Sequence, residues 1–259
     1  MSKFDLLTKI TDTGYREPAA IIDSENFEKL VQSRRSVRVY LEDETIEDEI
    51  VEKCLELALL APNSSNLQPW EFYWVKDPEK LDQLKKFCVS QSAARTAPTI
   101  IVAVAKLATW DRNRKLMVDL FNEQVTKPSK GAYYYYQKIA KLAYNQGFLN
   151  WFGTIKRVLF FFQRLKGDIV PGAPTSHSDM RVWAHKSTAL ACENLMLAFR
   201  AYGYDSCPME GLDPVRIKGL LGLDRNSEVC MAISAGKRAP HGLFSERVRF
   251  DKELFIKKI

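Results

Sequence analysis

Histidine and cysteine are scarce in this chain of 259 residues, which contains three histidines and five cysteines. The cysteines form no Cys-x-x-Cys pair, and their odd number argues against a disulfide framework. His177, His185 and His241 fit no metal-ligand or Ser/His/Asp pattern, so we expect each to be structural or at the surface. The sequence therefore favours reduced thiols in the cytoplasm, and it indicates neither a metal site nor a catalytic nucleophile.

Long hydrophobic runs and nucleotide-binding glycine motifs are also missing. The apolar run 97–105 ends at Lys106, which makes it too short to span a bilayer, and residues 1–10 do not resemble a signal peptide. No G-x-G-x-x-G follows a predicted strand and no G-x-x-x-x-G-K-[ST] occurs, so a Rossmann site and a P-loop are unsupported. With 46% hydrophobic and 27% charged residues, the composition indicates one soluble domain with a sizeable core.

The positive charge of the chain is concentrated in one segment. The net charge is +6, but residues 106–170 contain 12 Lys and Arg against four Asp and Glu, or +8, which leaves the rest at −2. The same segment holds 13 of the 29 aromatic residues. We therefore predict a single domain over 1–259 with a basic, aromatic-rich helical insertion at about 106–175. The charge fits either a solvated surface or an anionic partner such as nucleic acid, a membrane or a phosphorylated ligand.

Helical and strand patterns are mixed along the chain without regular βαβ repeats, which favours an α+β fold. Capping patterns place a helix start at Thr45, with Asp48 three residues on, and another at Asp213, with Pro214 next and Gly222 past the end. The predicted helices are 25–33, 45–61, 78–88, 183–202 and 214–221, and the predicted strands are 71–75, 99–105 and 228–234.

One predicted helix lies inside the insertion. Its apolar residues recur with helical spacing, and Phe160 and Phe161 extend the stripe around the helix. A helix buried on two sides, in the core or at a subunit interface, explains this pattern; the alternatives are a lid over a substrate pocket and a helix at a membrane surface. The stripe consists of Phe148, Trp151, Phe152, Ile155, Val158, Leu159 and Phe162.

Three polar segments could carry chemistry, and the first is Ser33-Arg34-Arg35-Ser36-Val37-Arg38-Val39-Tyr40. Guanidinium and hydroxyl groups are the donors that bind a phosphate group well. In an extended chain, the side chains of Arg34, Ser36 and Arg38 would point the same way. The alternative interpretation is a solvated basic turn.

The second segment, Ala61-Pro62-Asn63-Ser64-Ser65-Asn66-Leu67-Gln68-Pro69-Trp70, lies between a predicted helix and a predicted strand. Its amides and hydroxyls suit a polyhydroxyl chain or ring heteroatoms, although an ordinary turn would also explain them. The third segment, Cys207-Pro208-Met209-Glu210-Gly211, is a turn that can present backbone N–H groups to a ligand. We interpret Cys207 as a packing residue.

In this order, the three segments resemble the nitroreductase-like family of FMN-dependent NAD(P)H oxidoreductases. The matching patterns are R-x-S-x-[RK]-x-[YF], P-x-S-x-N-x-Q-P-W and P-x-E-G-x-D, and the helix pattern A-x-x-x-x-N-L-x-L-A matches Ala189 to Ala198. The resemblance covers roughly 28–105 and 182–250. It implies a central, mainly antiparallel sheet flanked by helices in a domain-swapped homodimer, with FMN at the subunit interface.

The resemblance also implies a reaction and a set of ligands. NADH or NADPH would reduce FMN, and FMN would reduce a nitroaromatic, quinone or related acceptor by ping-pong kinetics, with no catalytic side chain. By analogy with the family, the FMN phosphate and ribityl chain would be held by Arg34, Arg35 and Ser36, and the pyrimidine edge of the ring would face Arg38. The partner chain would supply Pro62, Asn63, Ser64 and Asn66, and Gln68 is a further candidate to bind the cofactor. The ring would lie along Pro208, Met209, Glu210 and Gly211, and the candidates to close the phosphate site are Lys237, Arg238 and Arg247.

Two other interpretations remain open at this stage. A flavin protein without turnover, such as a sensor or store, would have the same motifs. A basic protein could instead use the 106–170 segment to bind nucleic acid or a membrane surface. We favour the enzyme, with a small-molecule acceptor, no nucleic acid partner and no stable membrane insertion.

Overall fold

The computed structural model describes residues 12, 14–125, 128–170 and 172–259. Its centre is an antiparallel sheet in the order β1-β2-β4-β3. The strands are β1 (Trp70–Trp74), β2 (Thr99–Lys106), β3 (Asp205–Met209) and β4 (Ser227–Gly236). The strands pair antiparallel with one another, β1 and β3 form the edges, and an isolated parallel bridge joins Ser36 to Ser206 of β3. The predicted α+β class and the mainly antiparallel sheet are therefore confirmed.

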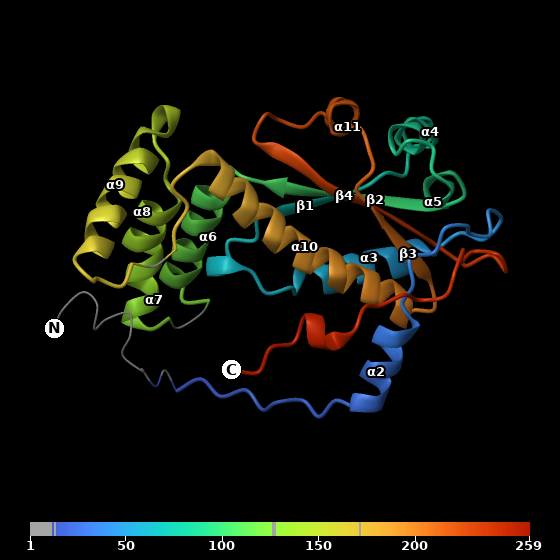
Figure 1. Cartoon of the computed structure of the whole chain (residues 1–259), viewed down its shortest axis with the longest axis horizontal. Coiled ribbons are helices and arrows are strands. Elements are labelled where there is room, and N and C mark those ends of the chain that lie inside the picture. The colour runs from blue at the N-terminus through green and yellow to red at the C-terminus, as the bar shows by residue number, and fades with distance from the viewer. Residues whose placement is uncertain (1–11, 13, 126–127, 171) are drawn as a thin grey trace.

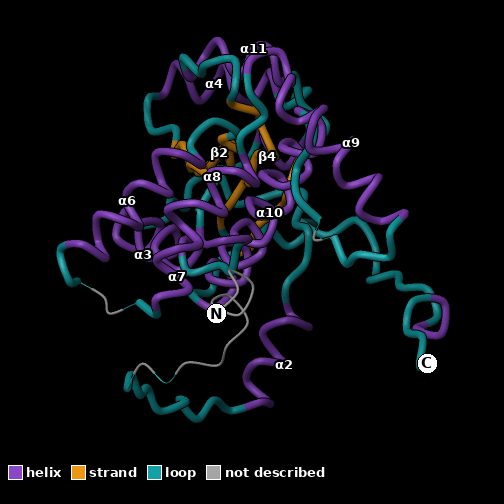
Figure 2. Tube along the Cα trace, turned by 90° about the vertical axis from the view of Figure 1, so that its left-hand side faces the viewer, coloured by secondary structure: helices purple, strands orange, loops and turns teal. Residues whose placement is uncertain are grey.

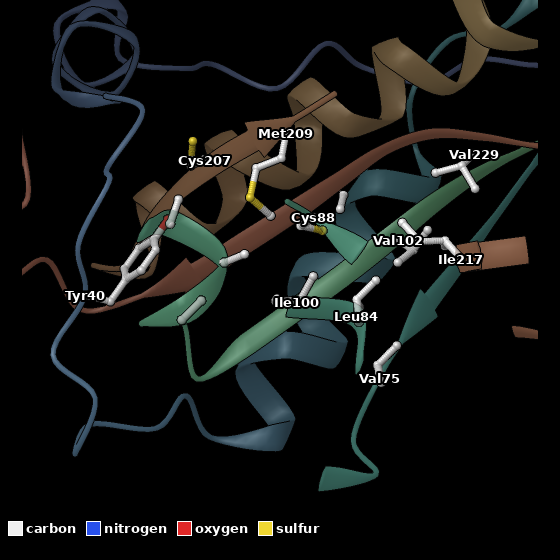
Figure 3. Packing of buried hydrophobic residues seen from close by; sticks show 14 of the residues in the cluster. Tyr40, Val75, Leu84, Cys88, Ile100, Val102, Cys207, Met209, Ile217 and Val229 are labelled. Carbon is white, nitrogen blue, oxygen red and sulfur yellow. The ribbon is translucent and has the colours of Figure 1, made fainter. Parts of the chain in front are cut away.

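Helices cover both faces of the sheet, and strand β2 shows how the sequence divides between them. Its residues alternate: Ile100 and Val102 join one buried cluster, whereas Ile101 and Ala103 join another. The first cluster, part of which is drawn in Figure 3, lies under α4 (Pro78–Phe87), α5 (Ser92–Arg95) and α11 (Pro214–Leu221). The second lies under α3 (Asp48–Leu59) and α10 (His177–Ala201). A strand buried on both faces explains the continuous apolar run.

The basic segment forms a group of helices at one end of the sheet (Figure 1). A third buried cluster joins these helices to α10 through Tyr136, Tyr144 and Trp183. The helices are α6 (Trp110–Asn122), α7 (Lys130–Tyr134), a π-helical turn (Tyr135–Ile139), α8 (Ala140–Tyr144) and α9 (Trp151–Leu165). Lys127, one of the basic residues of the segment, lies outside the described residues.

The apolar helix α9 is exposed over most of its length. Within the helix only Gly153 and Lys156 are buried, while Trp151 is 71% exposed and Phe162 is 55% exposed. A helix buried on two sides in the core of its own chain is therefore wrong for this segment. The subunit interface, the lid and the membrane surface remain possible positions for it.

Both described ends of the chain reach away from the body of the molecule (Figure 2). Helix α2 (Ser24–Ser33) contains no buried residue, and every residue from 244 to 259 is exposed. The exposed side chains include Phe27, Phe250 and Phe255. These two segments, which we call the terminal arms (14–33 and 244–259), leave apolar surface uncovered by their own chain.

Most predicted elements occur within a few residues of their expected bounds. The start of α11 is confirmed, because the Asp213 side chain accepts from two backbone N–H groups and Gly222 adopts φ +65° at the end. The cap at Thr45 is wrong, since the helix begins at Asp48 after Glu47 and without a side-chain cap. Strand β3 was also missed, because its Pro208 and neighbouring glycine indicated a turn.

Candidate functional site

The first polar segment forms one wall of a cavity of about 200 Å³. The opposite wall comes from the C-terminal segment 243–249. Five guanidinium groups line this space against a single carboxylate, that of Glu246, so an anion is the ligand that its charge favours. We call it the arginine pocket; its arginines are Arg34, Arg35, Arg38, Arg247 and Arg249.

The hydrogen bonds of these arginines leave their charge largely uncompensated. Arg35 donates to the backbone oxygen of Ser245 at 2.6 Å, and Arg247 donates to those of Gln32, at 2.9 Å, and Arg34. Arg34 is only 18% exposed, its Nε lies 3.9 Å from Glu193 Oε1, and its buried Nη1 has no partner within the described part of the chain. A buried guanidinium nitrogen without an acceptor is costly unless a ligand supplies one.

Mutual repulsion in the pocket affects the acidity of Arg247. Partial desolvation, with the positive charges of Arg249, Arg35 and Arg34, lowers the pKa of Arg247 below its usual value. An anion in the pocket would reverse this effect, because it favours the charged guanidinium.

The third polar segment lies directly beside the first. Residues 205–209 form edge strand β3, and the backbone N–H of Val37 donates to the oxygen of Ser206 at 3.2 Å. Arg38 Nη1 lies 3.3 Å from Cys207 Sγ. Burial raises the pKa of the Cys207 thiol, while Arg38 and Arg34 act in the opposite direction. Glu210 and Gly211 follow the strand and are exposed.

The second polar segment lies elsewhere in the chain. It forms a short 3₁₀ turn (Ser64–Asn66) that precedes β1, and Ser65, Asn66 and Gln68 all have φ between +43° and +60°. Such left-handed backbone is unusual for residues other than glycine and is often found at functional sites. Its side chains contact the basic segment at one end of the sheet, whereas α2 and β3 lie toward the other (Figure 1).

Tyrosine hydroxyls from the basic segment hold this loop in place. Ser64 Oγ lies 3.1 Å from the hydroxyl of Tyr144, and Tyr136 donates to the backbone oxygen of Ser65 at 2.9 Å. Ser65 Oγ lies 2.5 Å from the Tyr135 hydroxyl and 2.9 Å from that of Tyr144. In the sequence only the run of four tyrosines from Tyr133 pointed to this cluster, which was therefore not predicted.

The three basic candidates near the C-terminus have different surroundings. Arg247 lines the arginine pocket, as does Arg249, which the sequence analysis did not single out. Arg238 donates instead to the buried carboxylate of Asp205, and Lys237 Nζ donates to the Gly203 oxygen at 3.0 Å. Neither Lys237 nor Arg238 lines the pocket, so their predicted role at the phosphate has no support from this geometry.

Over 12, 14–125, 128–170 and 172–259 no group of three or more His, Cys, Asp or Glu side chains is placed to hold a metal ion. In the same residues no helix is both long enough and apolar enough to cross a membrane.

The chain is similar to proteins of one known family. The model of the nitroreductase family matches residues 31–237. The DrgA protein of Synechocystis is 28% identical over 208 residues, which are 80% of this chain and 82% of that protein. A Thermus thermophilus protein named NADH dehydrogenase is 26% identical over 219 residues, which are 85% of this chain and 90% of the relative.

Solved structures share the fold. A nitroreductase-like protein from Streptococcus mutans superposes with a TM-score of 0.68 and 23% identity, covering 92% of this chain and 100% of that one. A structure from Exiguobacterium sibiricum, solved in complex with FMN and named as a nitroreductase, has a TM-score of 0.64 and 24% identity. It covers 93% of this chain and 99% of that one.

Proposed function

Because the chain belongs to the nitroreductase family, we propose that it is an FMN-dependent oxidoreductase that takes electrons from NADH or NADPH and reduces a nitroaromatic, quinone or related acceptor. Bound FMN supplies the redox chemistry of both half-reactions, which therefore need no protein nucleophile. The observation that carries the proposal is the arginine pocket, where five guanidinium groups face one carboxylate and no described residue accepts a hydrogen bond from Arg34 Nη1.

The residues of the pocket suit the phosphate end of FMN. Arg34 and Arg247 approach the pocket from two different segments, which lets a phosphate group accept charge-assisted hydrogen bonds from both sides. Ser36 adds a hydroxyl to the same wall. Arg38, between the pocket and β3, is placed to stabilise negative charge on the ring, since it is held by the Cys207 sulfur and by no carboxylate among the described residues.

The second polar segment would complete the site of a partner chain. Its loop and the arginine pocket lie toward opposite ends of the sheet, so one chain alone does not bring the three segments together (Figure 1). A two-fold dimer can place the loop of one protomer against the pocket of the other. The terminal arms support this arrangement, because their exposed apolar residues, such as Phe250 and Phe255, need a cover that their own chain does not provide.

In such a dimer the insertion would bound the acceptor side of the partner's flavin. Tyr135, Tyr136 and Tyr144 hold the loop by their hydroxyls, so any ligand that reaches the loop also approaches the insertion. The basic and aromatic character of 106–170 would then favour flat, electron-poor or anionic acceptors.

The visible spectrum of the purified protein is the first test. We expect FMN to bind in a ratio of one per chain and to be released on denaturation, and initial rates with NADH or NADPH and a quinone to give the parallel double-reciprocal plots of a ping-pong reaction. A colourless protein that takes up no FMN on titration would overturn the proposal. Bound FMN without oxidation of either nicotinamide would indicate a flavin protein without turnover.

A further inference from the structure

A cluster of titratable side chains lies between α10 and β4, apart from the arginine pocket. Helix α10 contributes Arg181, His185 and Cys192, which are spaced by four and seven residues and so share one helix face. Strand β4 contributes Glu228, whose Oε2 lies 2.7 Å from Arg181 Nε and 3.1 Å from His185 Nε2. The fifth member is Cys230, two residues further along β4.

A β-bulge at Cys230 puts two consecutive residues, Cys230 and Met231, on the face of β4 that packs against the cluster under α10. In the register of β2 against β4, Ala103 pairs with Met231 and Val104 pairs with Val229, which leaves Cys230 as the extra residue. An extra residue of this kind redirects a side chain, and bulges are common beside functional sites. Cys230 consequently packs against the same buried cluster as Cys192 of α10.

The two sulfurs differ in exposure and in protonation. Cys192 is completely buried, whereas Cys230 is half-buried and lies beside His185 and Glu228, whose side chains are 32% and 21% exposed. Hydrogen bonds from Cys192 and His185 lower the pKa of the Cys230 thiol, against the effects of burial and of Glu210. The hydrogen bond to Cys230, burial and nearby acidic charge raise the pKa of the Cys192 thiol.

These contacts put a thiol of lowered pKa beside a proton donor and a second thiol. A thiolate is the reactive form of cysteine, and a neighbouring imidazolium both stabilises it and can protonate a leaving group. His185 retains the proton more readily than usual, because Cys230 and Glu228 raise its pKa. Arg181 faces Glu228 from the same helix and orients that carboxylate.

We propose that Cys230 and Cys192 form a peroxide-reactive thiol pair that closes to a reversible disulfide between β4 and α10. The Cys230 thiolate attacks one oxygen of a hydroperoxide, the O–O bond breaks, and His185 protonates the leaving hydroxide or alkoxide. Cys230 is then a sulfenic acid. The Cys192 sulfur attacks it, the S–O bond breaks, and the hydroxide leaves as water with the Cys192 proton. Two thiols are oxidised, one hydroperoxide is reduced, and an external dithiol restores the pair.

The test uses the full-length protein with stoichiometric hydrogen peroxide, followed by intact mass and peptide mapping. We expect the mass to fall by two hydrogens, a disulfide that joins Cys192 to Cys230, and full reversal by dithiothreitol. The proposal would be overturned by a disulfide between other cysteines or between chains. It would also be overturned if the protein reacted with peroxide no faster than a free thiol of ordinary pKa. This test does not depend on bound FMN, so it is independent of the proposed function.

Variants separate the two thiols. Cys192→Ser should halt at the sulfenic acid of Cys230, which dimedone traps, while Cys230→Ser should abolish peroxide consumption. Cys88→Ser is the matched control, since Cys88 is another completely buried thiol with no such partners. His185→Gln should slow the reaction of Cys230 about tenfold without loss of the fold, as judged by circular dichroism. Dimedone labelling of Cys88 or Cys54 in place of Cys230 would contradict the assignment.

Discussion

Arg238 donates two hydrogen bonds to the carboxylate of Asp205, from Nε to Oδ2 at 3.0 Å and from Nη2 to Oδ1 at 2.6 Å. Arg200 Nη1 adds a third at 3.1 Å, and Asp205 is only 6% exposed. This contact ties the start of β3 to the residues that follow β4 and to the end of α10. Because Arg238 is bonded to Asp205, the arginines of the pocket are the ones available to bind an anion.

Asp205→Asn should therefore destabilise the fold. The substitution keeps the shape of the side chain but removes the negative charge that two partly buried guanidinium groups share, at a cost of about 2 kcal/mol. Urea unfolding measures the loss, and Asp43→Asn, at an exposed turn, is the control that should change little. If the midpoint of urea unfolding were unchanged in Asp205→Asn, water would solvate the two arginines well enough without the Asp205 carboxylate.

Arg247→Ala should weaken FMN binding while riboflavin binding stays the same. Riboflavin lacks the phosphate, so only the FMN complex uses the guanidinium group, and loss of one charge-assisted hydrogen bond corresponds to roughly tenfold in the dissociation constant. Fluorescence titration with both flavins checks this. Arg225→Ala removes an exposed arginine outside the pocket and should bind both as the wild type does. If the affinities for FMN and riboflavin fell equally, the phosphate group would bind somewhere other than at Arg247.

Lys156 should give the stability a distinct pH dependence. Its buried Nζ donates to the oxygens of Ala143 and Pro174, both at 2.7 Å, and burial lowers the pKa of Lys156 to about 8. Between pH 8 and the ordinary lysine value of 10.5, the unfolded chain binds the proton and the folded chain does not. The free energy of unfolding of the wild type should thus rise relative to Lys156→Met, by about 1.4 kcal/mol per pH unit.

Urea unfolding of both proteins at pH 7, 8.5 and 10 measures that difference. Lys141→Met changes an exposed lysine of the neighbouring helix α8, and its stability should stay at a constant offset from the wild type. A constant offset for Lys156→Met as well would mean that Lys156 titrates normally in the folded chain.

Two glycines of α11 should respond to alanine in opposite directions. Gly219 lies within the helix and Gly222 ends it at φ +65°, and an added Cβ meets nothing within 4 Å at either position. Gly219→Ala should stabilise the protein by about 0.5–1 kcal/mol through helix propensity. Gly222→Ala should cost about 1 kcal/mol, because alanine avoids left-handed backbone. Thermal unfolding of the pair is the check, and shifts of the same sign would contradict this account.

The sequence predicted the parts of the molecule that local patterns determine. The apolar run of β2 and the capping residues of α11 were enough to place those elements, because burial and backbone capping act over a few residues. The pairing of Arg247 with the first polar segment was only one of three options, since Lys237, Arg238 and Arg247 look alike until tertiary contacts separate them. The bulge at Cys230 depends on the register between two strands, which no local pattern reports.

The last prediction concerns the division of the flavin site between two chains. We expect the pocket of one protomer and the loop of the other to form one flavin site. The variant Arg34→Ala and the double variant Asn63→Ala, Asn66→Ala should then each lose FMN. Mixed dimers of the two would have one site with every lesion and one site with none. Random pairing should then restore roughly a quarter of the flavin sites. Co-expression with two affinity tags, followed by measurement of flavin content and quinone reduction, provides the count. A site built within one chain would carry a lesion in every protomer, so mixed dimers without any recovered flavin would refute the shared arrangement.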